Sequence, residues 1–217
     1  MDHASPTNSV SLTADQAAHL AAKEADALRL IGEIVRDFAP AAFATSLGAE
    51  DMVITDLIAR AKVDIELFTL DTGRLPEETH RLIQEVRHHY GIAIHAYAPE
   101  RSDVETYIAA NGPNAFYYSI ELRKECCRIR KVVPLGRALS GKRAWITGLR
   151  RQQSETRQKT LILELYKFDV IFDRFILKLN PMANWSREQV QAYLKENDLP
   201  VNPLIARCRE RILQRMF

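Results

Sequence analysis

The hydrophobic positions of the chain follow two different periods, and the change between them marks the first predicted boundary. From Thr13 to about Phe38 the apolar residues recur every three or four positions, which predicts a helix or a helical pair closed by Pro40. The next apolar run, AAFATSL at residues 41–47, is short and predicts a buried strand that Gly48 interrupts. The chain therefore opens with a helical segment, residues 1–40, packed on a domain that contains strands.

Strand and helix patterns alternate through the middle of the chain. Strands are predicted at residues 65–70, 92–99 and 143–149, and helices at residues 50–61, 76–90, 102–112 and most of 118–139. After Gly148 the pattern loosens: residues 161–185 predict one or two strands with a turn, and residues 185–198 a helix with Ser186 as N-cap. This order favours an α/β fold with a doubly wound, mostly parallel sheet and helices on both faces.

Composition and charge narrow the class of protein. The 217 residues suit one domain with at most a small extension, and 30 basic against 28 acidic residues leave a net charge of +2. So small an excess does not favour nucleic-acid binding, and any positive site must be local. Three cysteines are not a disulfide framework, the N-terminus lacks the features of a secretory signal, and no apolar run reaches the ~20 residues of a membrane span. We expect a cytoplasmic protein without a membrane or nucleic-acid partner.

Two loops follow predicted strand ends and carry polar groups suited to a ligand. SLGAED, residues 46–51, lies where a strand meets a helix N-terminus, whose free N–H groups favour an anion. LDTGR, residues 70–74, ends the next strand, and Arg74 could pair with a phosphate. The alternatives are an ordinary strand-to-helix turn for the first loop and a tight turn with a solvated arginine for the second.

A third loop, GLRRQQSETR at residues 148–157, concentrates positive charge after the fourth strand. It contains Arg150, Arg151 and Arg157, and the segment from Arg123 to Lys131 adds five more basic residues. In a chain of balanced charge, such a concentration near strand ends predicts an anion site. A solvated basic face is the alternative.

The vicinal pair Cys126–Cys127 stands among charged residues in KECCRIRK, residues 124–131. Nearby Lys and Arg favour thiolates, which are good metal ligands, whereas two buried small hydrophobes on a helix are the alternative. Two thiolates cannot complete a zinc or iron–sulfur site, which needs further ligands.

Taken in this order, the motifs resemble those of the adenylyl-sulfate reductase family, within the phosphoadenylyl-sulfate reductase superfamily. The resemblance runs from about Phe43 to about Leu204 and includes NPMANWS and YLKENDLPVNPL, residues 180–186 and 193–204. It implies an adenine-nucleotide α-hydrolase-like domain at residues 41–204, followed by an atypical tail at residues 205–217. It also implies an oxidoreductase of sulfate assimilation and cysteine biosynthesis, which reduces adenylyl sulfate to sulfite and AMP with thioredoxin. The resemblance leaves open whether the protein forms a homo-oligomer.

The same resemblance implies roles for individual residues. SLGAED would be a modified pyrophosphate loop, Gly148 would lie against the adenine, and Lys131 would reach the substrate. Cys126 and Cys127 would supply half the ligands of a 4Fe–4S cluster. The full set of expected substrate-binding residues is Thr45, Ser46, Gly48, Asp51, Leu70, Thr72, Gly73, Arg74, Lys131, Gly148, Arg150, Arg151 and Arg157.

The chain departs from the family pattern after Leu204. Family members continue with a C-x-x-C and then a catalytic cysteine in a Glu-Cys-Gly-Leu-His tail, whereas IARCRERILQRMF follows here and Cys208 matches neither position. An amphipathic helix, an altered reading frame and a truncated product are three explanations. The expectation is an incomplete cluster and an inactive reductase. One alternative is a catalytically dead adenylyl-nucleotide-binding module. The other is a pyrophosphate-loop adenylyltransferase. Leu47 argues against the adenylyltransferase, because it replaces the first glycine of the usual pyrophosphate loop.

Overall fold

The computed structural model describes residues 13–168 and 174–205. Part of the region in which a turn is predicted, residues 169–173, lies outside the described residues, and so does Cys208. Within the described ranges, no helix has the length and apolar character needed to cross a membrane.

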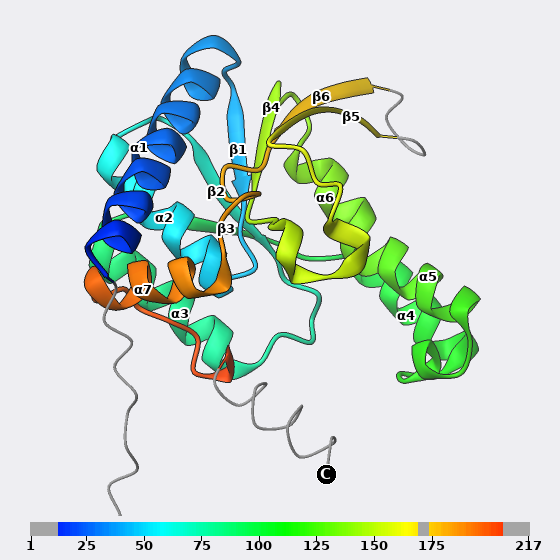
Figure 1. The fold of residues 1–217 in the computed structure, drawn as a ribbon. Helices are drawn as coiled ribbons and strands as arrows, with labels where there is room; N and C mark the ends of the chain where they lie inside the picture. Colours follow the sequence, from blue (N-terminus) through cyan, green and yellow to red (C-terminus); the bar gives the residue numbers. More distant parts are fainter. Residues whose placement is uncertain (1–12, 169–173, 206–217) are drawn as a thin grey trace, which may run out of the picture.

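One six-stranded sheet forms the centre of the molecule, with the strand order β3-β2-β1-β4-β6-β5 (Figure 1). Its strands are β1 Ala41–Ala44, β2 Glu66–Leu70, β3 Ile94–Tyr97, β4 Ala144–Thr147, β5 Leu163–Phe168 and β6 Arg174–Leu179. All neighbouring strands are parallel except β5, which pairs antiparallel with β6. The predicted mostly parallel sheet is confirmed, and the loose region after Gly148 forms two strands.

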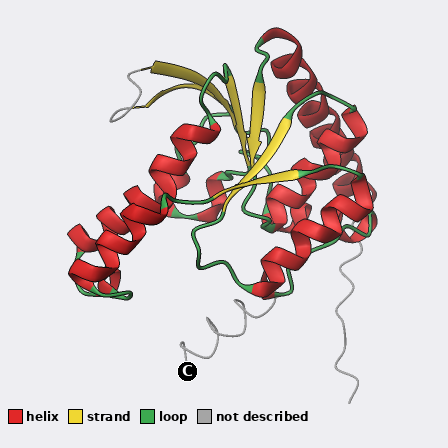
Figure 2. Cartoon of the chain, turned by 180° about the vertical axis from the view of Figure 1, so that it is seen from behind, coloured by secondary structure: helices red, strands yellow, loops and turns green. Residues whose placement is uncertain are grey.

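Helices cover both faces of this sheet, as predicted (Figures 1 and 2). One face carries α1 Ala14–Asp37, α2 Ala49–Ala61, α3 Glu77–Tyr90 and α7 Arg187–Glu196. The other carries α6 Val133–Ala138, from which α5 Ile120–Cys127 and α4 Arg101–Asn111 extend away from the sheet. Residues 120–138 are helical throughout, which confirms the prediction for most of residues 118–139, and a π-helix at Arg128–Val132 joins α5 to α6.

Two hydrophobic clusters follow from the alternation of side chains along the strands. Phe43 of β1 and Leu67 of β2 are buried against α1, α2 and α3, whereas Ala42 and Phe68 face α6 in a second cluster. Successive residues of a strand point to opposite faces, so short apolar runs such as AAFA serve both layers at once. Residues of α1, including Ile31, belong to the larger cluster, so the N-terminal helix packs on the domain as expected.

Local signals explain where the elements begin and end. Ser186 caps α7 and accepts a hydrogen bond from the Gln189 N–H in a capping box. Gly91 ends α3 in the left-handed conformation, at φ 69°. Strand β1 is shorter than the predicted 41–47, because the chain leaves the sheet after Ala44 and turns toward α2.

The strand order places a topological switch point between β1 and β4. From β1 the chain proceeds to β2 and β3 on one side, and it returns to β4 on the other. The loops after β1 and β4 therefore diverge, and open α/β sheets bind ligands in the crevice that such divergence leaves.

Candidate functional site

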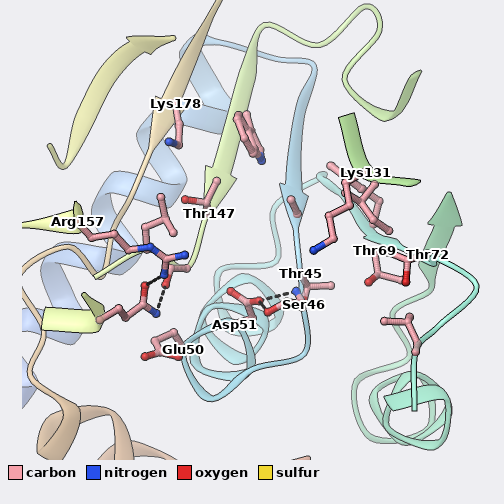
Figure 3. Close-up of a pocket in the computed structure, with 18 residues that line it drawn as sticks. Thr45, Ser46, Glu50, Asp51, Thr69, Thr72, Lys131, Thr147, Arg157 and Lys178 are labelled. Atoms are coloured by element: carbon pink, nitrogen blue, oxygen red, sulfur yellow. Dashed lines mark hydrogen bonds between the residues drawn. The ribbon is translucent and has the colours of Figure 1, made fainter. Parts of the chain in front are cut away.

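A cavity of about 490 Å³ lies at the carboxyl ends of β1, β2 and β4 (Figure 3). Several predicted residues line it together: Thr45, Ser46, Asp51, Leu70, Thr72, Lys131, Gly148 and Arg157. They come from four segments that are far apart in the sequence and that the fold brings to one edge of the sheet. The volume falls in the range of small-molecule sites.

The loop between β1 and α2 forms the floor of the cavity. The Ser46 backbone N–H donates to Asp51 Oδ2 over 2.5 Å, and the Ser46 hydroxyl donates to the same oxygen over 2.7 Å. Leu47 adopts the left-handed conformation at φ 58°, and its N–H donates to Thr45 Oγ1 over 3.0 Å. A leucine is strained there, but its side chain is fully buried in the larger core, which offsets the strain. Gly48 is the N-cap of α2 beside this loop and is not among the lining residues.

Asp51 is buried, with 6% of its surface exposed. Burial raises the pKa of its carboxyl group to about 6, although the hydrogen bonds from Ser46 favour the charged form. Its second oxygen lies against Gly148, where an added Cβ would stand 2.0 Å from Asp51 Oδ1. Only glycine fits at position 148 in this arrangement, so the loops after β1 and β4 meet through Asp51.

Two of the predicted cationic side chains reach the cavity from opposite sides (Figure 3). Lys131 comes from the π-helix, and Arg157 comes from a short 3-10 helix, Glu155–Arg157, where its guanidinium donates to Gln153 Oε1. In the same π-helix, Arg130 is buried and donates to the Thr72 carbonyl over 2.6 Å. That contact ties the loop after β2 to the segment that presents Lys131. The cavity is thus equipped to hold an anion.

Three predicted arginines are engaged elsewhere and do not line the cavity. Arg74 lies 4.9 Å above the Phe116 ring and donates to the Pro113 carbonyl. Arg150 is buried and pairs with Glu50 over 2.7 Å. Arg151 donates to the Thr160 carbonyl over 2.8 Å and to Asn184. Gly73, at φ 68°, lies near Arg130 outside the lining. These three arginines of the predicted anion site therefore make contacts within the protein and do not contribute their charge to the cavity lining.

Sequence reasoning missed several lining residues, of which Lys178 on β6 is the most informative. Its side chain is 10% exposed and pairs with Glu164 on β5 over 2.9 Å. Its Nζ stands 5.3 Å from the Trp145 ring centroid and 5.0 Å from that of Tyr166. A lysine inside the apolar run RFILKL was the available signal. Phe68, Thr69, Trp145, Thr147 and Gln153 also line the cavity.

The cysteine pair ends α5, and neither cysteine is among the cavity's lining residues. Cys126 is buried in a small cluster with Tyr107, Ala115 and Ile129, whereas Cys127 is exposed. The described residues contain no group of three or more His, Cys, Asp or Glu side chains that could hold a metal ion. Because a 4Fe–4S cluster is held by four ligands, the described part of the chain does not by itself fit that cofactor.

Comparison with known proteins identifies a family for the chain. Residues 40–212 match the model of the phosphoadenosine phosphosulfate reductase domain. The chain is 45% identical to adenosine 5'-phosphosulfate reductase of Allochromatium vinosum, over 85% of this chain and 70% of that protein. It is 47% identical to the protein of the same name from Burkholderia cepacia, over 87% of this chain and 73% of that protein.

Solved structures give the same fold. A phosphoadenylyl-sulfate reductase from Candida auris, a phosphate complex, superposes with a TM-score of 0.69 at 27% identity, covering 92% of this chain and 94% of that one. An NH3-dependent NAD synthetase from Campylobacter jejuni has a TM-score of 0.56 at 13% identity, covering 83% and 74%, and shows the shared adenine-nucleotide α-hydrolase-like fold alone. This chain belongs to the phosphoadenosine phosphosulfate reductase family.

Proposed function

We propose that the protein binds adenosine 5'-phosphosulfate and acts in its reduction to sulfite and AMP. The observation that carries the proposal is the cavity at the switch point, where Ser46, Lys131 and Arg157 surround one space. Relatives that are 45–47% identical over most of this chain bear the name of that activity. The 3'-phosphorylated substrate is supported less, because the structure named for it is only 27% identical.

The cavity has the two kinds of surface that this substrate needs. Phe68, Leu70 and Trp145 provide an apolar wall suited to a base, and the anion-binding side chains lie beyond it. In our proposal Lys131 and Arg157 hold the phosphosulfate and stabilise the negative charge that gathers on the departing phosphate. Positioning and charge compensation are the contributions of these residues.

The proposed reaction requires a soft nucleophile. A thiolate forms a bond to the sulfate sulfur while the sulfur–oxygen bond to AMP breaks, which leaves an S-sulfonated cysteine. Two electrons from a dithiol, for which we propose thioredoxin, then release sulfite and leave a disulfide in the reductant. No thiol lines the cavity within the described part of the chain, so the nucleophile is not assigned to any of those residues.

We also propose that Cys126 and Cys127 contribute two thiolates to a 4Fe–4S cluster. The support is the pairing of the two thiols at the end of a helix whose neighbours include Lys124 and Arg128. Iron and acid-labile sulfide are measured after anaerobic purification, with Cys127→Ser as the variant. The variant is expected to lose the iron, and equal iron in both proteins contradicts the assignment.

Calorimetric titration with adenosine 5'-phosphosulfate tests the main proposal. Lys131→Ala and Arg157→Ala are expected to weaken binding by about tenfold or more, since a hydrogen bond to a charged group contributes about 1.5–3 kcal/mol. The exposed Lys124→Ala and Lys159→Ala are matched controls outside the cavity and are expected to bind as the unaltered protein does. Sulfite release with thioredoxin then tests the reaction. The proposal is refuted if the protein does not bind adenosine 5'-phosphosulfate but releases pyrophosphate from ATP.

A further inference from the structure

The anion-binding loop is already occupied by a carboxylate of the chain itself. Asp51 Oδ2 accepts from both the Ser46 N–H and the Ser46 hydroxyl, at 2.5 and 2.7 Å. Ser46 and Asp51 both line the cavity, so an anion bound at this loop would need the donors that Asp51 now holds (Figure 3). Because Gly148 confines the other oxygen, the carboxylate has no free space on that side. Asp51 and a bound anion therefore compete for one pair of donors.

The charged groups that line the cavity with Asp51 are Glu50, Lys131, Arg157 and Lys178. Lys178 on β6 pairs with Glu164. Glu50 precedes Asp51 on α2, but that carboxylate pairs with Arg150 from the loop after β4. Lys131 and Arg157 reach the cavity from the π-helix and the 3-10 helix on either side. Burial disfavours the charge of Asp51 and raises its pKa to about 6. A second negative charge beside it disfavours that charge further, which drives the carboxylate toward its protonated form.

We propose that Asp51 is an internal competitor in the anion loop, and that binding of adenosine 5'-phosphosulfate is coupled to uptake of a proton by Asp51. The inference rests on the proposed function, since it assigns that ligand to this cavity. Protonation changes the hydrogen bonds in a defined way. The neutral acid donates its proton to Ser46 Oγ, which frees the Ser46 hydroxyl proton for the ligand. Asp51 is thus a positioning residue whose protonation state sets the donors that Ser46 offers.

The coupling has a sign that can be measured. If binding takes up a proton, the affinity for the ligand falls as the pH rises above the pKa of Asp51 in the unliganded protein, about 6. The limit for one proton is about tenfold in affinity per pH unit. Adenosine lacks the phosphosulfate and is expected to bind without this pH dependence.

Calorimetric titrations at pH 7, in three buffers of different ionisation enthalpy, give the number of protons taken up. The titrant is adenosine 5'-phosphosulfate without added thiol, because its phosphate and sulfate groups stay ionised at this pH. We expect about half a proton or more for this ligand and none for adenosine. Asp51→Asn removes the charge and is expected to abolish the uptake and to bind about tenfold more tightly than the unaltered protein at pH 8.

Asp56→Asn is the matched control. Asp56 is a second buried carboxylate on α2, but it accepts from the Tyr193 hydroxyl over 2.7 Å and is not a lining residue. This variant is expected to keep the proton uptake. Binding without proton uptake, or uptake that persists in Asp51→Asn, overturns the inference and leaves the proposed function intact. Absence of binding at every pH overturns the proposed function instead. If Asp51→Asn does not fold, the buffer series on the unaltered protein still decides the question.

Discussion

Replacement of Gly148 by alanine probes the closest contact in the site. The added Cβ would lie 2.0 Å from Asp51 Oδ1, 3.1 Å from Asp51 Cγ and 3.3 Å from Glu50 Cβ. The first of these distances is far below a van der Waals contact, so the Asp51 carboxylate has to move. Its other oxygen holds Ser46 through two hydrogen bonds, and the movement therefore loosens the loop after β1.

The magnitude follows from the two interactions that the methyl group disturbs. Overpacking of a filled site costs roughly 1–3 kcal/mol. A hydrogen bond to a charged group contributes about 1.5–3 kcal/mol, and at least one of the two from Ser46 has to break. We expect the free energy of unfolding to fall by about 3 kcal/mol, which a domain of ordinary stability survives.

Urea denaturation, followed by circular dichroism, measures this change, and titration with AMP measures the loss at the site. Gly32→Ala is the control, since Gly32 lies within α1 and an added Cβ there meets no heavy atom within 4 Å. That variant is expected to gain about 0.5–1 kcal/mol from helix propensity. The double variant Gly148→Ala with Asp51→Ala is expected to recover part of the loss, because it removes the obstructing side chain. Ordinary surface substitutions change the free energy of unfolding by less than about 0.5 kcal/mol. The contact would be refuted if Gly148→Ala changed this free energy by no more than that and the variant bound AMP as well as the unaltered chain.

Three further predictions concern stability. The pKa of Asp51 is raised from 3.8 to about 6 in the folded chain, so its contribution is fully present below pH ~4 and is lost as pH rises through 6. Relative to Asp51→Asn, the unaltered protein should lose about 3 kcal/mol of unfolding free energy across that window. This prediction is wrong if urea titrations show that the difference in unfolding free energy between the two proteins does not change with pH. Tyr193→Phe removes the hydroxyl that donates to buried Asp56 and should cost about 1–3 kcal/mol while AMP affinity stays unchanged; a change in affinity would contradict this separation. Ser186→Ala deletes the N-cap of α7 and should cost about 1 kcal/mol in thermal or urea unfolding, and an unchanged transition would show that the cap is dispensable.

Much of the architecture was predictable because its signals are local. The switch from a helical period before Pro40 to a short apolar run at residues 41–47 marked the passage from α1 to β1. Alternation of such runs with amphipathic segments predicted the parallel sheet and its two helical layers, which the structure confirms. Glycine and serine at helix ends set boundaries through their own backbone preferences, so Gly91 and Ser186 ended and began helices as expected.

The residues of the cavity were predictable where they belong to loops after strands. Ser46, Thr72 and Gly148 follow strands that the pattern identified, and the carboxyl ends of parallel strands meet at one edge of a sheet. The density of arginines was a poorer guide. A run of charges in sequence says nothing about which partner each charge will meet, and Arg150 meets Glu50 across a hundred positions.

By itself, then, the sequence determined the periodicities, the turns, the loops and the motifs that mark the family, since each depends on neighbouring residues. The tertiary structure decided which of the predicted cations reach the cavity and which are engaged elsewhere. Lys178 borders it because β6 lies beside β4, a pairing between distant segments. Lys131 extends into it from a π-helix that joins α5 to α6, a local feature that the pattern did not predict (Figure 3). Burial raises the pKa of Asp51, and Gly148, nearly a hundred residues later, lies against its carboxylate; the sequence does not show this, because desolvation depends on what packs against a group in space.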